Sequence, residues 1–543
     1  MYDVPPLTAQ VARAVFPHGN PVMQMYDRLG MLVRDSDFAD LFPRQGQPAE
    51  APARLALATL LQFWEGLTDR QAADAVRTRI DWKYLLCLEL TDPGFDHTVL
   101  SEFRTRLLTH GAERRLFDVI LTYAQTHNLL RAGGRQRSDS THILGAMRMM
   151  TRLETVTETL RYALNTLATI APDWVRLHAT PEWVDRYGLR ASEYRLPKGQ
   201  TKRLGWAEQT GRDGYTVLSA LYTDTTVAGL RDIPAIETLR QVWIQNFMIV
   251  DEHLTWRDNN NTPPSGGYIA SPYDGDARYA TKRQTYWVGY KIHLTETYGP
   301  DIPNLITNVE TTHAAVSDDA VTETIHASLA ERHMLPEQHV ADTGYVNAPL
   351  LVSSQTTYDI DLIGPTRGDN HWQAKEGSGF AARDFTIDWE QQHAICPVGK
   401  RSNSWTPAID RFKNEVIKIK FATTDCRDCA SQQSCTRSTP SRRTITIRPQ
   451  AQHEALLAGR KREQTPHYKA VYAQRAGVEG TIAQSVRSCD VRRSRYIGQA
   501  KTHLQHVMSA AAINVMRILR WLANEPKAAT RRSAFALLYQ SMA

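Results

Sequence analysis

Three acidic residues lie in sequence contexts that suit a metal-dependent active site. Asp139 follows a short polar run, Asp342 ends the strand-like segment 338–341, and Glu479 comes four residues after Arg475 in a helical stretch. Carboxylates are the hard oxygen ligands that Mg²⁺ and Mn²⁺ prefer, and strand ends are where α/β sheets bind ligands. Two such ions about 3.5–4 Å apart can activate an attacking oxygen and stabilise a leaving oxygen at phosphorus. The three acids together predict a two-metal site.

Each acid taken alone also has an ordinary structural explanation. Asp139 and Asp342 could be turn or cap residues. Glu479 could be a surface partner of Arg475 at i,i+4 spacing, which contributes only a few tenths of a kcal/mol. The prediction of a site therefore depends on the combination.

A cysteine cluster indicates a second kind of metal site. Four of the six cysteines fall within 40 residues: Cys396, Cys426, Cys429 and Cys435. Four thiolates satisfy tetrahedral zinc, and a C-x2-C pair in a reducing setting is more often a metal clamp than a disulfide. The spacing is not a symmetrical pair of CxxC motifs, His393 could replace one thiol, and free thiols remain the alternative. We expect a structural Zn²⁺, with Cys87 and Cys489 buried as small hydrophobic residues.

Composition excludes several classes of protein. The chain has 543 residues, 42% hydrophobic and 22% charged, which are globular values and correspond to roughly three to five domains. No apolar run approaches the length of about 18 residues that a membrane span needs, and the first ten residues do not resemble a secretory signal. Six cysteines are too few for a disulfide scaffold, so we expect a cytoplasmic protein.

The formal net charge of +6 conceals an asymmetry. Residues 401–543 carry 25 Lys and Arg against 9 Asp and Glu, whereas residues 1–400 carry 39 against 49. A basic C-terminal block attached to an acidic body favours a polyanionic partner, although a solvated basic surface is the simpler alternative. The size of the excess favours nucleic acid.

The N-terminal part of the chain is expected to be helical. Helical runs over 53–64 and 68–78 flank Gly66, and Thr68 with Gln71 has capping-box spacing. Further helices are expected over 82–90 and 99–108. Helices around a tight turn are typical of helix-turn-helix DNA binding but also of plain bundles.

Beyond a helical stretch at 143–245 and a Pro/Gly/Asn-rich linker at 258–273, the periodicity changes. Strands and helices alternate from there, which predicts an α/β fold. The expected strands are 286–295, 304–311, 338–341 and 359–365, and the expected helices are 318–332 and 347–354. Residues 385–449 are β-rich, and 467–489 and 498–522 are helical.

Several of these segments together resemble one family. They are the strand segment Trp287–Glu296, the ADTGY run at 341–345, the Y-x2-R-x3-E pattern at 472–479, the CPxG…CxxC…C insertion and the basic run 492–506. Over nearly its whole length the chain is similar to bacterial insertion-sequence transposases of the DDE class, whose catalytic domain has an RNase H-like fold. The resemblance implies a catalytic triad of Asp139, Asp342 and Glu479 with two Mg²⁺ or Mn²⁺ ions.

The resemblance also implies a reaction. The site would cut at the transposon end and direct the released 3′-OH onto a target phosphodiester, with no covalent enzyme–DNA intermediate. Tyr472 would then be a DNA contact. The family's Lys seven residues after the Glu is Val486 here, with Arg487 beside it as a substitute. The expected phosphate contacts are Arg475, Arg487, Arg492, Arg493, Arg495 and Lys501.

The expected architecture is mixed α/β, an RNase H-like core with two insertions and an all-α N-terminal domain. The boundaries are 1–130 for the DNA-binding helices, 131–142 for the first core strand, 143–270 for a helical insertion, 271–370 for the core, 371–465 for a β-rich Cys insertion, 466–525 for the C-terminal catalytic helices and 526–543 for a tail. Expected partners are double-stranded DNA, as terminal inverted repeats and target, and a second copy on paired ends, with no membrane. A DNA-binding relative that no longer cuts, or a general metal-dependent nuclease, are the alternatives.

Overall fold

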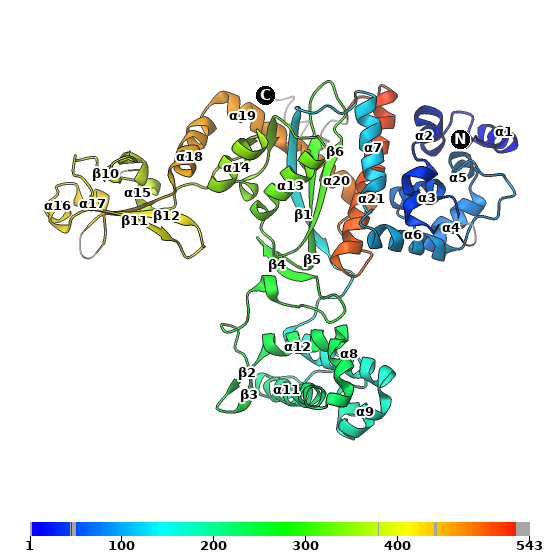
Figure 1. The fold of residues 1–543 in the computed structure, drawn as a ribbon, viewed down its shortest axis with the longest axis horizontal. Helices are drawn as coiled ribbons and strands as arrows, with labels where there is room; N and C mark the ends of the chain where they lie inside the picture. Colours follow the sequence, from blue (N-terminus) through cyan, green and yellow to red (C-terminus); the bar gives the residue numbers. More distant parts are fainter. Residues whose placement is uncertain (1–2, 44, 46–49, 378, 439–441, 528–543) are drawn as a thin grey trace, which may run out of the picture.

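The computed structural model describes residues 3–43, 45, 50–377, 379–438 and 442–527. A six-stranded mixed sheet lies at its centre (Figure 1). The strands follow the order β4 (Arg278–Lys282), β5 (Thr285–Thr297), β1 (Arg135–Leu144), β7 (Gln338–Val340) and β8 (Asp361–Ile363), and β6 (Ile306–His313) also pairs with β5. The mixed α/β class predicted from the sequence is confirmed.

Strand direction places the two sheet acids near each other. β1 is antiparallel to β5 and parallel to β7, which in turn is parallel to β8. Asp139 pairs with Leu294 in the middle of β1, so it lies inside the strand, which extends to Leu144. Asp342 directly follows the adjacent parallel region of β7, as the sequence indicated.

Helices cover both faces of the sheet (Figure 1). On one side lie α13 (Asp319–Glu331) and α14 (Ala348–Tyr358), and on the other α20 (Gly477–Cys489), α21 (Gln499–Leu522) and α7 (Arg115–Thr126). The helix expected over 467–489 is divided into α19 (Pro466–Ala473), a 3-10 turn η6 (Gln474–Ala476) and α20. Of the expected tail at 526–543, residues 528–543 lie outside the described part of the chain.

The N-terminal region is helical. It contains α1 (Pro6–Val15), α2 (Pro21–Leu29), η1 (Asp35–Leu41), α3 (Pro52–Glu65), α4 (Asp69–Thr78), α5 (Ile80–Leu85), α6 (His97–Thr109) and α7. The predicted capping box is confirmed, because Thr68 and Gln71 exchange hydrogen bonds at the start of α4. Gly66 ends α3 with φ 72°, a left-handed conformation that suits glycine. α5 is shorter than expected because the chain leaves the helix at Cys87, which has φ 51°.

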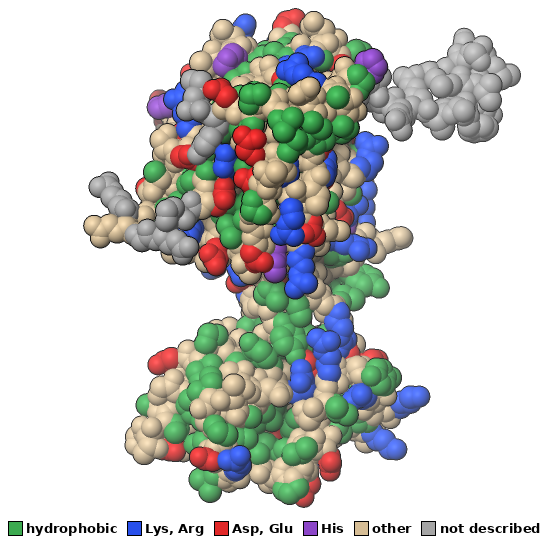
Figure 2. All heavy atoms as spheres, turned by 90° about the vertical axis from the view of Figure 1, so that its right-hand side faces the viewer, with side chains coloured by type: hydrophobic (Ala, Val, Ile, Leu, Met, Phe, Trp, Pro, Cys, Tyr) green, Lys and Arg blue, Asp and Glu red, His purple; other side chains and the backbone are tan. Residues whose placement is uncertain are grey.

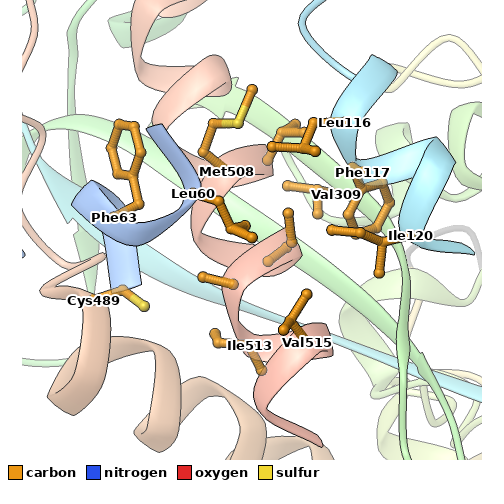
Figure 3. Packing of buried hydrophobic residues seen from close by; sticks show 14 of the residues in the cluster. Leu60, Phe63, Leu116, Phe117, Ile120, Val309, Cys489, Met508, Ile513 and Val515 are labelled. Atoms are coloured by element: carbon orange, nitrogen blue, oxygen red, sulfur yellow. The ribbon is translucent and has the colours of Figure 1, made fainter. Parts of the chain in front are cut away.

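These N-terminal helices share one hydrophobic core with the sheet. Leu60 and Phe63 of α3 and Phe117 of α7 pack in the same cluster as Val309 of β6 and Ile513 of α21 (Figure 3). Helix α21 is buried along most of its length and contacts α3, α7 and β6. The N-terminal helices, called the helical head below, therefore share a continuous hydrophobic core with the sheet through α21.

A helical insertion follows β1. It comprises α8 (Arg152–Ile170), α9 (Pro172–His178), α10 (Pro181–Tyr187), α11 (Gln200–Thr223), η2 (Thr225–Asp232) and α12 (Pro234–Asn246), with its own hydrophobic core. A hairpin of β2 (Phe247–Val250) and β3 (His253–Trp256), which the sequence did not predict, closes it. The 3-10 turn η3 (Ser265–Gly267) leads back to the sheet. Figure 2 shows many hydrophobic side chains on the surface of this insertion. Leu177, Val184 and Tyr194, which belong to the insertion, are 81%, 69% and 78% exposed.

A second insertion follows β8 and η5 (Ala382–Asp384). Its strands are β9 (Thr386–Asp388), β10 (His393–Ile395), β11 (Ser404–Ile409), β12 (Glu415–Lys420) and β13 (Thr444–Ile447). Short helices accompany them: α15 (Trp372–Lys375), α16 (Thr423–Arg427) and α17 (Gln432–Cys435), and α18 (Gln450–Glu463) returns to the body beside α14. The expected β-rich character of 385–449 is confirmed.

Candidate active site

Arg475 joins two of the three predicted acids. Its Nη1 lies 3.0 Å from Asp139 Oδ2 and its Nη2 lies 2.9 Å from Glu479 Oε1. The i,i+4 pairing of Arg475 with Glu479 was expected, whereas the bond to Asp139, 336 residues away, was not. Asp139 and Arg475 have side chains 14% and 17% exposed, while Glu479 on the first turn of α20 is 61% exposed. The site therefore opens to solvent on the Glu479 side.

The carboxyl group of Asp139 has a raised pKa. Burial raises its pKa above the ordinary aspartate value, and the negative charge of Asp342 adds to this effect. The backbone N–H of Ser140, which donates to Asp139 Oδ1 at 2.7 Å, and the Arg475 guanidinium act in the opposite direction. In the parallel pairing of β1 with β7, Arg137 lies opposite Val340, so Asp342 follows β7 beside Asp139 on β1.

Asp342 begins the 3-10 turn η4 (Thr343–Tyr345), and its Oδ1 accepts a hydrogen bond from Gly344 N at 2.7 Å. A Cβ on Gly344 would lie 2.8 Å from Asp342 Oδ1 and 3.1 Å from Asp318 Oδ2, so these two oxygens are within about 6 Å of each other. Asp318 immediately precedes α13, but its side chain does not cap the helix. Instead Lys291 Nζ lies 3.1 Å from Asp318 Oδ1. Sequence reasoning assigned Asp318 and Lys291 no place near the site, and nothing in their spacing indicated one.

A buried hydroxyl lies behind the carboxylates. The Tyr345 hydroxyl is 2.7 Å from His293 Nδ1, and both side chains are buried. Burial raises the pKa of Tyr345 well above its ordinary value, and the charges of Asp318, Asp139 and Asp342 raise it further. Burial also lowers the pKa of His293 to about 4. The phenol and the imidazole are therefore both neutral near pH 7.

Tyr472 lies beside the same acids. Its ring stacks on Tyr468 with centroids 5.8 Å apart, and the Arg475 guanidinium carbon is 5.9 Å from its centre. Burial raises the pKa of Tyr472, so it remains a neutral phenol at physiological pH. The side chain is only partly buried, which leaves it accessible for contact with a ligand.

The other predicted DNA contacts divide into two groups. Arg487, Arg493 and Lys501 are exposed. Arg492 and Arg495 are partly buried and bonded within the protein: Arg492 Nη2 donates to Thr141 Oγ1 at 3.1 Å, and Arg495 Nη1 donates to the carbonyl of Leu67 at 2.9 Å.

Val486, at the family's lysine position, packs against the main hydrophobic core. Val486 lies seven residues after Glu479, on the same face of α20 and two turns further along the helix. The neighbouring Arg487 is exposed, and its Nε donates to the carbonyl of Ala483 on the preceding turn.

The clustered cysteines line one small cavity of about 30 Å³: Cys396, Cys426, Cys429 and Cys435. All are free thiols, and Cys87 and Cys489 are buried elsewhere, as expected. The N–H of Lys400 donates to Cys396 Sγ at 3.2 Å, and the N–H of Arg443 donates to Cys426 Sγ at 3.4 Å. Burial raises the pKa of Cys435 to about 11, and the neighbouring sulfurs contribute. His393 does not line this cavity.

Within the described residues, no three or more His, Cys, Asp or Glu side chains are arranged so that they could hold a metal ion as they stand. At the catalytic acids, the Arg475 guanidinium lies between Asp139 and Glu479. A metal ion at these oxygens would have to replace this guanidinium.

Two family models match parts of the chain. One, described as Transposase domain (DUF772), matches residues 11–106, and the other, described as Transposase DDE domain, matches residues 395–519. The chain is an insertion-sequence transposase of the DDE class. No curated protein and no solved structure matches it.

The two matches cover different parts of this transposase. The first covers most of the N-terminal helices, and the second contains Glu479 and all four clustered cysteines. Asp139 and Asp342 lie outside both ranges, so their place in the site depends on the geometry described above. Membership of the class implies that the transposase binds DNA and acts with divalent metal ions. No helix in the described ranges is long and apolar enough to cross a membrane.

Proposed function

We propose that this transposase cuts DNA at transposon ends and transfers the resulting 3′-OH to a target phosphodiester, with Asp139, Asp342 and Glu479 as catalytic residues. The observation that carries the proposal is the convergence of Asp139 from β1 and Glu479 from α20 on one guanidinium. The parallel register of β1 and β7, which places Asp342 beside Asp139, adds the third carboxylate. The central mixed sheet is then the RNase H-like core.

The donor set suits Mg²⁺ or Mn²⁺. Asp139 and Glu479 both contact the Arg475 guanidinium, and with Asp342 nearby the site has an excess of negative charge and only hard oxygen ligands. Asp139 and Asp342 would hold two ions, with Glu479 completing the site. When bound, the two cations would activate the attacking oxygen and stabilise the leaving oxygen.

The protein's own groups orient these carboxylates. Backbone N–H groups of Ser140 and Gly344 hold one oxygen each of Asp139 and Asp342. Tyr345 and His293 form a neutral, buried support behind them, which keeps water from that side. Glu479, on the open side, is free to change its side-chain conformation when Arg475 moves from the carboxylates to a DNA phosphate.

Exposed cations around the site provide the phosphate contacts. Arg487 on α20, Arg493 in the following segment and Lys501 on α21 are exposed, and we assign them to the DNA backbone. Tyr472 and Arg475 would lie nearer the cut. Arg492 and Arg495 keep their predicted role only if their internal hydrogen bonds open. We further propose that residues 1–130 read the terminal repeats and that two copies act on paired ends.

The cysteine cavity is proposed as a structural zinc site. The four sulfurs already share one cavity, and rotation of their side chains would give the tetrahedral set that zinc requires. The surrounding core is small, formed mainly by Phe385, Ile419, Phe421 and Ile445. A bound zinc ion would stabilise the fold of this insertion beyond what so few apolar residues can provide.

A strand-transfer assay tests the catalytic proposal. Wild-type protein with Mg²⁺ and the DNA that flanks its gene should give nicked and joined products, and Asp139→Asn, Asp342→Asn and Glu479→Gln should each lose at least 10³-fold in rate. Asp359→Asn is the matched control, because Asp359 is an exposed carboxylate before the start of β8, whereas Asp342 follows the end of the neighbouring parallel strand β7.

The other outcomes identify the alternatives. DNA binding without nicking by the wild type would favour an inactive relative, and cutting without regard to end sequence would favour a general nuclease. Full activity in all three variants would show that the triad is wrong.

A further inference from the structure

Glu296 of β5 is a fully buried carboxylate that meets two arginines. Arg137 Nη2 lies 2.6 Å from Glu296 Oε1, and Arg517 Nη1 lies 2.8 Å from Oε2. The side chains of Glu296, Arg137 and Arg517 are 0%, 6% and 15% exposed. A charge buried to this extent is stable only with paired partners, and each member here has one.

The same network holds the start of α20. The Thr481 hydroxyl donates to Glu296 Oε2 and accepts from Arg517 Nη2 at 2.6 Å. Arg517 also donates to Gln484 Oε1, one turn further along α20. The Arg137 guanidinium donates to the carbonyl of Gln474 in η6. Strands β1 and β5 and helices α20 and α21 therefore meet at one carboxylate.

Gly477 shows how closely the strand and the helix approach. A Cβ at this position would lie 2.1 Å from Arg137 Nη1 and 2.4 Å from its Cζ, distances that no side chain could accept without a shift. The first residue of α20 thus packs directly on the guanidinium, and the absence of a side chain at Gly477 is what permits it.

The position of the network relative to the acids suggests its role. Arg137 is two residues before Asp139, on the same face of β1, and Thr481 is two residues after Glu479 on α20. Elsewhere α20 is held by the buried apolar residues Val478, Ile482 and Cys489. Hydrophobic packing of this kind fixes a helix on its support but tolerates small sliding, whereas directed hydrogen bonds to charged groups define its register.

We propose that Arg137, Glu296 and Arg517 are positioning residues that fix α20 against β1 and thereby set the separation of Asp139 and Glu479. The network contains none of the three proposed catalytic acids, and it acts through Asp139 and Glu479. The inference rests on the proposed function of those acids.

The first test is Thr481→Val, which removes the hydroxyl but keeps the branched shape. The matched control is Ser485→Ala, because the Ser485 hydroxyl is equally buried on α20 but donates only to the carbonyl of Thr481. Thr481→Val should raise the dissociation constant for Mn²⁺, measured by calorimetry without DNA, by at least fivefold, and should lower kcat of end cleavage by at least tenfold. Thr481→Ser should restore both, and Ser485→Ala should change neither.

A second variant separates positioning from folding. In Gly477→Ala the added Cβ would displace the Arg137 guanidinium, while alanine, a better helix former than glycine, favours α20 itself. The proposal predicts weaker Mn²⁺ binding and slower cleavage, with circular dichroism unchanged. Wild-type Mn²⁺ affinity and cleavage in both Thr481→Val and Gly477→Ala would overturn it.

The two proposals fail in different ways. If Asp139→Asn cleaves normally, the catalytic assignment is wrong. If Asp139→Asn is inactive while Thr481→Val and Gly477→Ala behave as wild type, the assignment stands and only the positioning role is lost. Should Thr481→Val not fold, Gly477→Ala alone decides.

Discussion

Arg475 and Asp139 form a 3.0 Å ion pair between a 3-10 turn near the C-terminus and the middle of the first core strand. Arg475 bridges two acids, because its other terminal nitrogen is bonded to Glu479. The cation that the sequence places four residues before Glu479 thus occupies the space between two proposed metal ligands.

Removal of Arg475 should strengthen metal binding and weaken DNA binding. In Arg475→Ala the carboxylates lose a competing cation, and an ion pair of limited exposure contributes about 1 kcal/mol, which corresponds to about fivefold in affinity. We expect Mn²⁺ to bind about fivefold more tightly in calorimetry without DNA. Arg475→Lys, which retains the charge, should stay close to wild type. Weaker Mn²⁺ binding in Arg475→Ala would contradict the competition.

Arg495 and Arg493 should respond differently to the same change. Arg495 donates to the Leu67 carbonyl and lies over the Phe63 ring at 5.6 Å, so Arg495→Ala should lower the free energy of unfolding by about 2 kcal/mol. Arg493 is exposed, so Arg493→Ala should leave the melting temperature unchanged. It should also reduce the salt dependence of DNA binding by about one phosphate contact. Thermal melts and binding isotherms at several salt concentrations measure both quantities. Equal stability of the two variants would contradict this division.

Acid should destabilise the fold through its buried histidines. Burial lowers the pKa of His506 to about 3, and its Nδ1 is 2.7 Å from Thr311 Oγ1. In the unfolded chain a histidine has a pKa of about 6.5, so between pH 6.5 and 3 the unfolded state binds a proton that the folded state does not. Stability is therefore complete above pH 6.5 and falls as the pH decreases, by about 2 kcal/mol at pH 5 for this residue.

His506→Gln tests this contribution. Glutamine can keep the bond to Thr311 but takes up no proton, so the loss of stability between pH 6.5 and 5 should be smaller by about 2 kcal/mol than in wild type. Denaturant unfolding across this range measures it, and His18→Gln is the control because His18 is exposed. Identical pH curves for His506→Gln and wild type would refute the assignment.

Zinc should be found at the cysteine cavity. Purified protein should contain about one zinc per chain, Cys426→Ser should lose it, and Cys489→Ala, a buried cysteine outside the cluster, should keep it. Since burial raises the pKa of Cys435 to about 11 without metal, zinc uptake by the apoprotein should release protons and become more favourable as pH rises. Metal analysis of the two variants decides, and equal zinc content in both would exclude this site.

Local signals in the sequence were sufficient for many elements. Thr68 and Gln71 indicated the start of α4 because a capping box involves only neighbouring residues. The expected strands at 286–295 and 304–311 correspond to β5 and β6, and the i,i+4 pair of Arg475 and Glu479 formed as expected.

Features that depend on distant partners could not be predicted. β1 is polar but largely buried, because Ser138 bonds His339 and Gln136 bonds the carbonyl of Met334, each about 200 positions away. Asp318 comes close to Asp342 only because the start of α13 lies beside the end of β7. The break at η6 is likewise fixed by Arg137, whose partner Glu296 lies on another strand.

The hydrophobic core that the helical head shares with the sheet through α21 restricts movement of the head relative to Asp139. Because Phe63 and Leu60 of α3 pack in the same cluster as Ile513 and Val309, the helical head cannot turn without exposing that surface to water. A DNA duplex bound by the head would therefore lie at a constant distance from Asp139. Under the proposed function, this rigid connection fixes the number of base pairs between the sequence that the head recognises and the bond that is cut.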